Sequence, residues 1–435
     1  MRRCTLCLAI LLCCTALTRV EAAEITTVMN AFDPADPFDG ALSVQWDWML
    51  RKSQINRQSV CSNIAGLCPG EQRMISLREL NSRRSSNTMN IQFRAGFYKG
   101  MEFFMNFPFV LEDRTRLTFS SNVDWNNSTV DPLGGPSLFA VPNDGSKRSG
   151  FGDMSLGIRY APFAQWRDPL YPSWMLAFTY TVPTGALRRA DNDGVGAGLH
   201  ILRIETAASR RIAFFEPYFG VFGNLRFPSS TTLFKNYGEN QGQVWPGHEL
   251  GLTIGAEFFP WDSPREDGKK GGYVSLDVGF SAMYTFKGRG YTDLFDALGT
   301  SACNVDPTCR LTAYTRTQEN DPTPGIERMD GMTDVGAFGT FSTWAGFNVQ
   351  PIENVSLGFR FTYSRETAHY LTNADVGNDL DGDEPGGSPG VDFTNSRGQN
   401  EYNPVYNENV DEPGKRLRSV GANFYGIMLT LTGKL

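Results

Sequence analysis

Much of this chain alternates apolar with polar residues, and a period of two restricts it to β-structure. The clearest example lies between Gly152 and Gly185, where two alternating segments flank a turn-rich connection. In a soluble β-sandwich the apolar face of each segment points inward to a core. In a membrane barrel the same face points outward to lipid, and the polar face lines a lumen. Trp166, Tyr171 and Trp174 crowd the connection, as aromatic residues do where a barrel meets the membrane surface.

The connections between the alternating segments decide between these two architectures. We find about twelve such segments, and their connections alternate between short turns and long polar loops. Outer-membrane barrels sort their connections in this way, with short periplasmic turns and long outer loops. The expected loops include residues 53–86, 112–150 and 368–416. One of the expected strands, at 215–222, contains Pro217, which counts against that assignment. We therefore predict an all-β, transmembrane, antiparallel up-and-down barrel of about 12 strands with both termini in the periplasm.

The N-terminus has the composition of a secretory signal peptide. Arg2 and Arg3 form a positive start, Leu6 to Leu17 is an apolar run, and cleavage is expected after Ala22. No later run approaches the ~18 apolar residues that a spanning helix needs. The predicted division is a signal peptide at 1–22, a periplasmic N-terminal segment at 23–40 and an outer-membrane barrel at 41–435.

The predicted mature chain is acidic. Of 40 basic and 47 acidic residues, Arg2, Arg3, Arg19 and Glu21 leave with the signal peptide, so 37 and 46 remain and the net charge is −9. This balance argues against a nucleic-acid partner, which needs a basic surface. The partners we expect are outer-membrane lipid and lipopolysaccharide, the barrel-assembly machinery during biogenesis, and a small solute. No cofactor is predicted.

Four cysteines remain after removal of the signal peptide, in two closely spaced pairs. Export to an oxidising compartment predicts a local disulfide within each pair. The alternative is a four-cysteine metal site, although its ligands are usually spaced more closely than these. The pairs are Cys61 with Cys68 and Cys303 with Cys309.

Polar and aromatic residues opposite the apolar stripes are expected to line the lumen. The charged ones form either a network of ion pairs that fills the barrel or a selectivity lining, and mixed signs favour the network. The aromatic ones provide either a surface for aromatic solutes or simple filling. The lumen-lining candidates are Asp47, Arg51, Arg94, Glu102, Arg159, Glu216, Tyr218, Phe222, Glu257, Asp277, Trp344 and Arg360.

The longest loop carries a cluster of carboxylates, whose hard oxygen atoms at this density can hold calcium. The full twelve-residue calcium-loop pattern is missing, so a solvated acidic loop is the favoured interpretation. The calcium candidates are Asp379, Asp381, Asp383 and Glu384. His200, His248 and His369 lack the His-x-Ser-Asn-Gly context of barrel phospholipases, so we predict no enzyme.

Three motifs resemble those of a family of outer-membrane transporters. They are Phe151-Gly-Asp-Met-Ser-Leu-Gly-Ile-Arg-Tyr160, Thr179-Tyr-Thr-Val-Pro-Thr-Gly185 and Glu216-Pro-Tyr-Phe-Gly-Val-Phe222. The family is named for the meta-pathway of phenol degradation and is related in architecture to the long-chain fatty acid transporters. The resemblance implies a channel or transporter for small, hydrophobic or aromatic solutes.

The alternative function is a non-enzymatic structural barrel of a surface machine, in polysaccharide export or motility, with loops that bind partners. The fatty acid transporters carry an N-terminal plug, whereas here only Glu24 to Phe38 precedes the first strand. A full plug is therefore not expected, although Phe32-Asp33-Pro34 could enter the lumen.

Overall fold

The computed structural model describes most of the chain. The described residues are 23–33, 36–61, 73–135, 137–230, 232–235, 241–263, 272–304, 329–382, 390–392 and 395–434. The predicted signal peptide therefore lies outside them.

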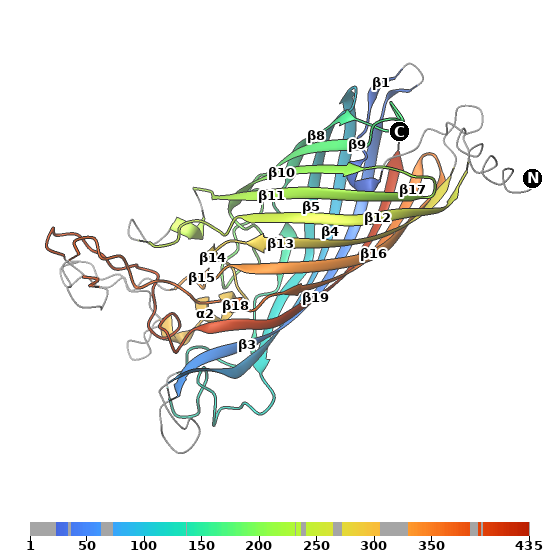
Figure 1. Cartoon of the computed structure of the whole chain (residues 1–435). Coiled ribbons are helices and arrows are strands. Elements are labelled where there is room, and N and C mark those ends of the chain that lie inside the picture. The colour runs from blue at the N-terminus through green and yellow to red at the C-terminus, as the bar shows by residue number, and fades with distance from the viewer. Residues whose placement is uncertain are drawn as a thin grey trace, which may run out of the picture.

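Twelve long antiparallel strands close into one barrel (Figure 1). Each strand pairs with its neighbour in the sequence, and the last pairs with the first, so the barrel leaves no open edge. This confirms the predicted fold and strand number. The strands are β3 (Gly40–Cys61), β4 (Arg73–Tyr98), β5 (Met101–Phe119), β8 (Ser155–Phe163), β9 (Ser173–Thr181), β10 (Leu199–Ser209), β11 (Phe215–Pro228), β12 (Glu249–Asp262), β13 (Tyr273–Thr285), β16 (Phe338–Ile352), β17 (Val355–Glu366) and β19 (Leu417–Lys434).

Short elements occupy the N-terminal segment and the long loops. Among the described residues, no helix is long and apolar enough to cross a bilayer. The short strands are β1 (Ala31–Asp33), β2 (Asp36–Phe38), β6 (Asn143–Asp144), β7 (Arg148–Phe151), β14 (Gly288–Gly290), β15 (Thr333–Val335) and β18 (His369–Tyr370). The helical turns are η2 (Glu24–Thr26), η3 (Leu233–Lys235), η4 (Ala302–Asn304) and α2 (Phe295–Gly299).

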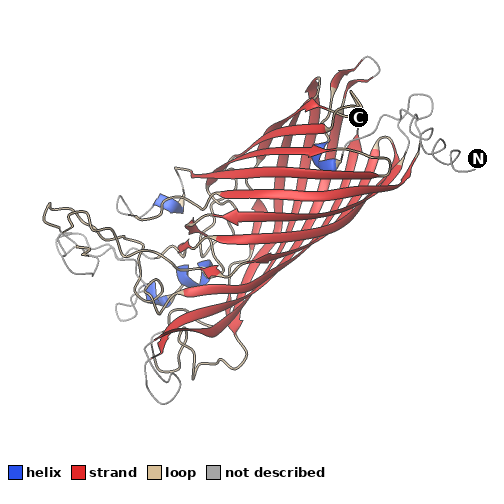
Figure 2. Ribbon diagram, viewed as in Figure 1, coloured by secondary structure: helices blue, strands red, loops and turns tan. Residues whose placement is uncertain are grey.

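The connections are sorted between the two ends of the barrel. Figure 2 shows the irregular loops gathered at one end, which we call the long-loop end. The short-turn end carries the connections at 99–100, 164–172, 210–214 and 353–354, and the end of β12 and the start of β13 also lie there. The first strand begins and the last strand finishes at this same end, as an even number of strands requires.

Two details of the prediction are wrong. Residues 53–86 are not one loop, because β3 and β4 stay paired as far as Cys61 and Arg73. Residues 112–150 likewise include the end of β5 together with β6 and β7. In both places the strands extend beyond the apolar belt, where both faces are polar and the sequence resembles a loop.

Pro217, which argued against a strand, lies within β11 and pairs with Ala256 of β12. On its other side β10 has already ended at Ser209, and the next residue, Arg210, donates its N–H to the Pro217 carbonyl. The missing proline N–H therefore falls where the ladder between β10 and β11 stops.

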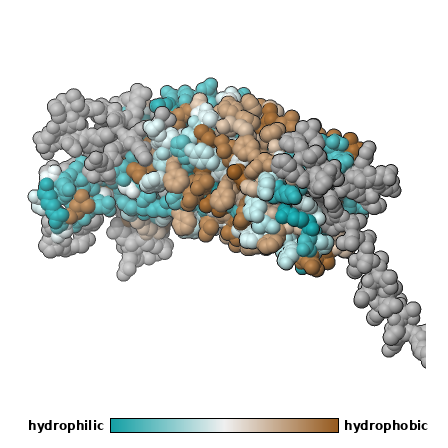
Figure 3. All heavy atoms as spheres, turned by 90° about the horizontal axis from the view of Figure 1, so that it is seen from above, coloured by the Kyte–Doolittle hydropathy of each residue, from teal (hydrophilic) through white to brown (hydrophobic). Residues whose placement is uncertain are grey.

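The outward face of the barrel is apolar. Figure 3 shows a hydrophobic band across the middle of the molecule, with hydrophilic residues toward the loops. Phe178 is 54% exposed, Phe219 50% and Ile254 46%, although all three lie within strands. Soluble monomers rarely expose contiguous apolar surface on this scale, whereas a lipid-facing barrel requires it.

Aromatic side chains mark both borders of this band. Toward the short-turn end, Phe163 stacks on Tyr171 and Trp174, with ring centroids 5.3 Å and 5.9 Å away. Toward the long-loop end, Phe227 packs edge-on against Trp245 at 5.9 Å. Aromatic girdles of this kind sit at the two interfaces of a membrane barrel.

Several inward-facing aromatic side chains pack directly against glycines of the neighbouring strand. A Cβ added to Gly279 would come within 2.1 Å of the Trp344 ring, and one added to Gly251 within 2.4 Å of the Phe222 ring. Tyr218 covers Gly255 and Phe104 covers Gly157 in the same way. The rings therefore fill the wall, which favours the filling role for them.

We expect Gly279→Ala to destabilise the barrel by about 1–3 kcal/mol, because its methyl group would displace the Trp344 ring. Gly426→Ala is the matched control, since Gly426 also faces the lumen but the nearest atom to a Cβ there would be Thr362 Cβ at 3.6 Å, an ordinary van der Waals distance. The measurement is the urea midpoint of each variant in detergent micelles. Equal midpoints would contradict the proposed fit between ring and glycine.

Candidate functional site

The N-terminal segment lies inside the lumen near the short-turn end. The N–H of Ala23 donates to Glu216 Oε1 at 2.5 Å, and the N–H of Glu24 donates to Glu257 Oε1 at 2.7 Å. Farther along, the N–H of Met29 donates to Glu102 Oε2 at 2.8 Å. Because these carboxylates belong to β11, β12 and β5, residues 23–30 extend across the lumen. We call residues 23–30 the inner plug.

Apolar contacts also hold the inner plug. Ile25 and Val28 pack on a small buried cluster formed by Met175, Ala177 and Ala207 on β9 and β10. Of Phe32-Asp33-Pro34, which the sequence analysis allowed to enter the lumen, Phe32 and Asp33 lie in β1, which pairs with β2, and Pro34 lies outside the described residues.

A glycine in the barrel wall makes room for the inner plug. Asn30 lies so close to β4 that a Cβ at Gly96 would approach its carbonyl oxygen to 2.1 Å. The Gly96 N–H also donates to the carbonyl of Asp39, after the inner plug, at 2.9 Å. Only glycine allows this approach of two backbones.

At the other end, the long loops fold inward over the mouth. The helical turn α2 lies between two buried apolar clusters, so Leu294 and Leu298 are fully buried. Beside it, Arg148 pairs with Asp296 at 2.6 Å across two loops. The described loops therefore form a packed outer cap rather than an open funnel. The larger cluster comprises Ile55, Leu80, Leu117, Val130, Leu138, Phe139, Val141, Leu294, Ala297, Leu298, Cys303, Met329, Leu371, Val410 and Leu417.

Between the inner plug and the outer cap, several lumen side chains are partly exposed. Arg203 bonds Glu205 at 2.9 Å and lies 4.1 Å above the Phe222 ring. The side chains of Arg203 and Glu205 are 34% and 21% exposed, although both point inward. Asp47, on the inward face of β3, accepts hydrogen bonds from Gln45 and Asn90 and is also partly exposed. The middle of the barrel is therefore charged and leaves room for water.

The twelve predicted lumen residues all lie on inward-facing strand positions, as the strand pairings show. One group surrounds Asp277, whose Oδ1 accepts from the Tyr218 hydroxyl at 2.6 Å. Its Oδ2 accepts from Trp344 Nε1 at 2.7 Å and from Arg360 at 3.1 Å. This one carboxylate on β13 thus connects side chains of β11, β16 and β17.

A second group surrounds Glu102, which is fully buried. Arg94 holds both of its oxygens at 2.7 Å, and Arg159 lies 3.7 Å from one of them. Arg159 also sits 5.1 Å above the Phe104 ring. These contacts fit the network interpretation for this part of the lumen.

A third group joins the barrel wall to the outer cap. Arg51 of β3 pairs with Asp293 in the loop after β14 and with Glu366 of β17 at 3.0 Å. Asp113 accepts hydrogen bonds from Arg84 at 2.8 Å and from Arg188 at 2.7 Å. Sequence reasoning missed Asp113 and its partners, because Arg84 and Asp113 lie in stretches that it read as loops.

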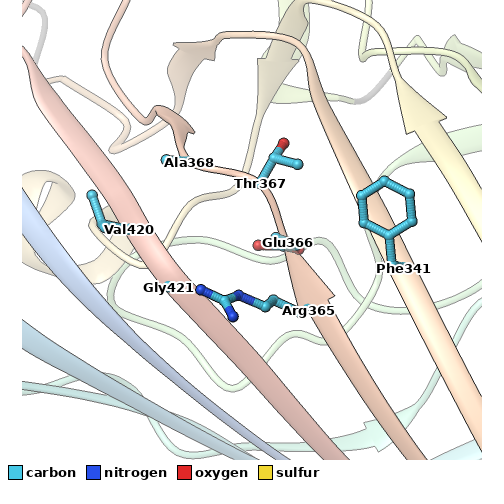
Figure 4. Close-up of a pocket in the computed structure, with 7 residues that line it drawn as sticks. All are labelled: Phe341, Arg365, Glu366, Thr367, Ala368, Val420 and Gly421. Carbon is cyan, nitrogen blue, oxygen red and sulfur yellow. The ribbon is translucent and has the colours of Figure 1, made fainter.

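A cavity of about 410 Å³ opens in the barrel wall between β16, β17 and β19 (Figure 4). Here β19 changes register between Val420 and Asn423, and Gly421 takes a positive φ of 62°. The cavity is lined both by Phe341, which faces outward, and by Glu366, which faces inward. It therefore lies between the lipid-facing and the lumen-facing sides of the wall.

The calcium candidates are placed only in part. Asp379 and Asp381 lie with Glu401, and one oxygen of each falls within 4.8 Å of the others. Glu401, which the sequence did not suggest, already accepts hydrogen bonds from the Leu380 and Asp392 amides. Asp383 and Glu384 lie outside the described residues.

The cysteine and histidine residues play no evident chemical role where they are described. Cys303 is disulfide-bonded, whereas Cys68, Cys309 and the side chain of Cys61 lie outside the described residues. His200 stacks on Tyr180, and His369 stacks on Phe338.

The last long loop contains a buried carboxyl group that makes its stability depend on pH. Burial raises the pKa of Asp411 from 3.8 to about 7, although the Ala374 and Asn407 amides both donate to it at 3.0 Å. The folded loop thus keeps a proton that the unfolded loop loses above about pH 4, so its stability falls as the pH rises toward about 7.

We therefore expect residues 367–416 to be cleaved faster by protease at about pH 8 than at about pH 5. Asp411→Asn should flatten this dependence, since asparagine keeps an accepting oxygen without the titration. Asp379→Asn is the control, because Asp379 is exposed. A pH dependence that survives in Asp411→Asn would contradict the assignment. Limited proteolysis in micelles, normalised to a peptide substrate at each pH, gives the measurement.

Solved structures of outer-membrane proteins resemble this chain over most of its length. An outer-membrane channel from Pseudomonas putida F1 has 11% sequence identity and a TM-score of 0.39, covering 93% of this chain and 99% of the other. A FadL homologue from Pseudomonas aeruginosa has 10% identity and a TM-score of 0.29, covering 92% and 91%. The outer-membrane protease OmpT from Escherichia coli has 7% identity and a TM-score of 0.26, covering 92% and 96%. No family model and no curated protein matches the chain.

Proposed function

We propose that this chain is a channel of the bacterial outer membrane that passes small solutes, with the short-turn end in the periplasm. The observation that carries the proposal is the charged middle of the lumen, which leaves room for water where Arg203 and Glu205 remain partly exposed between two closures. A barrel that served only as a scaffold would have no need of water in its interior. The inner plug and the outer cap are then the parts that control passage.

For the solute, we propose a small hydrophobic or aromatic compound. The support is the cavity in the barrel wall, which is lined by Phe341 and Val420 and borders both the lipid face and the lumen. A solute that partitions into the bilayer could use such an opening, whereas a polar solute could not. The motif resemblance to transporters named for phenol degradation points to the same class.

Proteoliposome uptake tests the proposal. Purified protein should increase the entry of a small aromatic acid, such as benzoate, more than the entry of a sugar of similar mass. Val420→Trp, which fills the wall cavity, should reduce benzoate entry and leave the sugar unchanged. No increase for any solute, with or without the inner plug, would favour the structural barrel of a surface machine instead.

A further inference from the structure

Two buried carboxylates near the short-turn end lack a basic partner within the described part of the chain. Glu216 is fully buried and Glu257 is 5% exposed, and they lie opposite one another on β11 and β12. Neither forms an ion pair with a basic side chain of the described residues. Glu216 Oε2 has no hydrogen-bond partner among those residues. An ionised carboxylate that is buried without a countercharge is costly.

The neighbouring carboxylates of the lumen are compensated. Asp277, which pairs with Glu257 across β12 and β13, contacts Arg360, and Glu102 contacts Arg94. Glu216 and Glu257 instead meet the main chain of the inner plug, through the nitrogen atoms of Ala23 and Glu24. The position where a cation is needed is therefore occupied by a backbone nitrogen.

The nitrogen that meets Glu216 belongs to the residue after the predicted cleavage position. Hydrolysis of the Ala22–Ala23 peptide bond by a signal peptidase consumes one water molecule. Ala22 leaves as a carboxylate, and the nitrogen of Ala23 takes up a proton to become an ammonium group with three donors. In the uncleaved chain the same nitrogen is an uncharged amide with a single donor.

We propose that the α-ammonium group created at Ala23 is the missing cation for Glu216 and Glu257, so that signal-peptide cleavage completes the closure of the lumen by the inner plug. The inference rests on the export that the proposed function assumes, but not on which solute the channel passes. In this proposal Glu216 binds the new N-terminus through an ion pair.

The surroundings already hold Ala23 in the required position. The hydroxyls of Thr26 and Thr27 donate to the Ala23 carbonyl at 3.2 Å and 2.9 Å, which fixes the first turn of the segment. Ser209 donates to Glu216 Oε1 at 2.6 Å and leaves Oε2 for a second proton of the ammonium group. The side chain of Glu24 is directed to Arg360, at 3.2 Å, and so does not compete for the ammonium.

Chemical labelling of the mature protein tests the proposal. Protein purified from outer membranes is first shown by mass spectrometry to begin at Ala23, and is then labelled in micelles at neutral pH with an amine-reactive ester. An ion pair keeps the amine protonated and unreactive, so the α-amine should label at least about tenfold more slowly than in Glu216→Gln. Glu249→Gln is the control, because Glu249 lines the lumen but pairs with Arg226.

A second measurement separates the charge from the packing of Glu216. Mature chain acetylated at Ala23 and refolded keeps every side chain but loses the ammonium. It should show more frequent spontaneous channel openings, and adding Glu216→Gln should increase them no further. A mature N-terminus elsewhere, equal labelling of the α-amine in wild type and Glu216→Gln, or independent effects of acetylation and mutation would each overturn the proposal. Absence of current in all forms would count against the channel function alone, because the labelling result does not require conduction.

Discussion

Deleting residues 23–30 is expected to raise the single-channel conductance several-fold, because the inner plug crosses the lumen from β11 and β12 to β5. Removal leaves the strands and their pairings intact, so the barrel itself should still fold. The measurement is current through single proteins in planar bilayers, for the full mature chain and for the deletion. The largest change should come as longer open times and a higher open-state current.

A substitution in the wall provides an independent test of the same closure. Gly96→Val should push Asn30 away from β4 and mimic the deletion, since a Cβ there would lie 2.1 Å from the Asn30 carbonyl oxygen. Ala95→Val, at the adjacent outward-facing position, should leave the current unchanged. If the deletion and Gly96→Val both conduct like the full chain, the inner plug is not the constriction.

The second large effect is expected on stability. Ile254→Arg places a charge on the outward face near the middle of β12 and should cost about 2–4 kcal/mol in lipid. Thr253→Arg places the same side chain one residue away on the lumen face, where Thr253 is partly exposed, and should cost much less. The measurement is the free energy of unfolding in lipid vesicles, from reversible guanidinium titration.

These two substitutions at adjacent positions test directly which face of the barrel meets lipid. A larger loss for Thr253→Arg than for Ile254→Arg would mean that the apolar stripes pack inward. Similar, small losses for both would mean that neither face meets hydrocarbon at this depth.

Local sequence signals predicted the barrel well. Within the membrane the outward face must be apolar, so the period of two persists from strand to strand and identifies positions such as Tyr218 and Arg360. Within a strand, every second residue therefore faces lipid, and the residues between them face the lumen. The alternation of short turns with long loops then indicated that the strands form a closed membrane barrel.

The same logic explains where the prediction failed. Beyond the apolar belt the strands no longer need an apolar face, so the outer halves of β3 and β4 look like a loop although their ladder continues. The contacts of Asp113 with Arg188, and of Ala23 with Glu216, join residues far apart in sequence. They form only when distant parts of the chain come together in the fold, and no local pattern encodes them.

The pairing of β3 with β19 has a consequence for incomplete products of translation. This ladder joins Ala41 to Lys434, so the final eighteen-residue strand must be synthesised before the first strand gains its second neighbour. A polypeptide truncated anywhere before Leu417 retains two unpaired rims, whose amides find no partner in hydrocarbon. Premature stop codons late in the reading frame should therefore abolish the protein as completely as early ones, leaving material for proteases rather than a shortened pore.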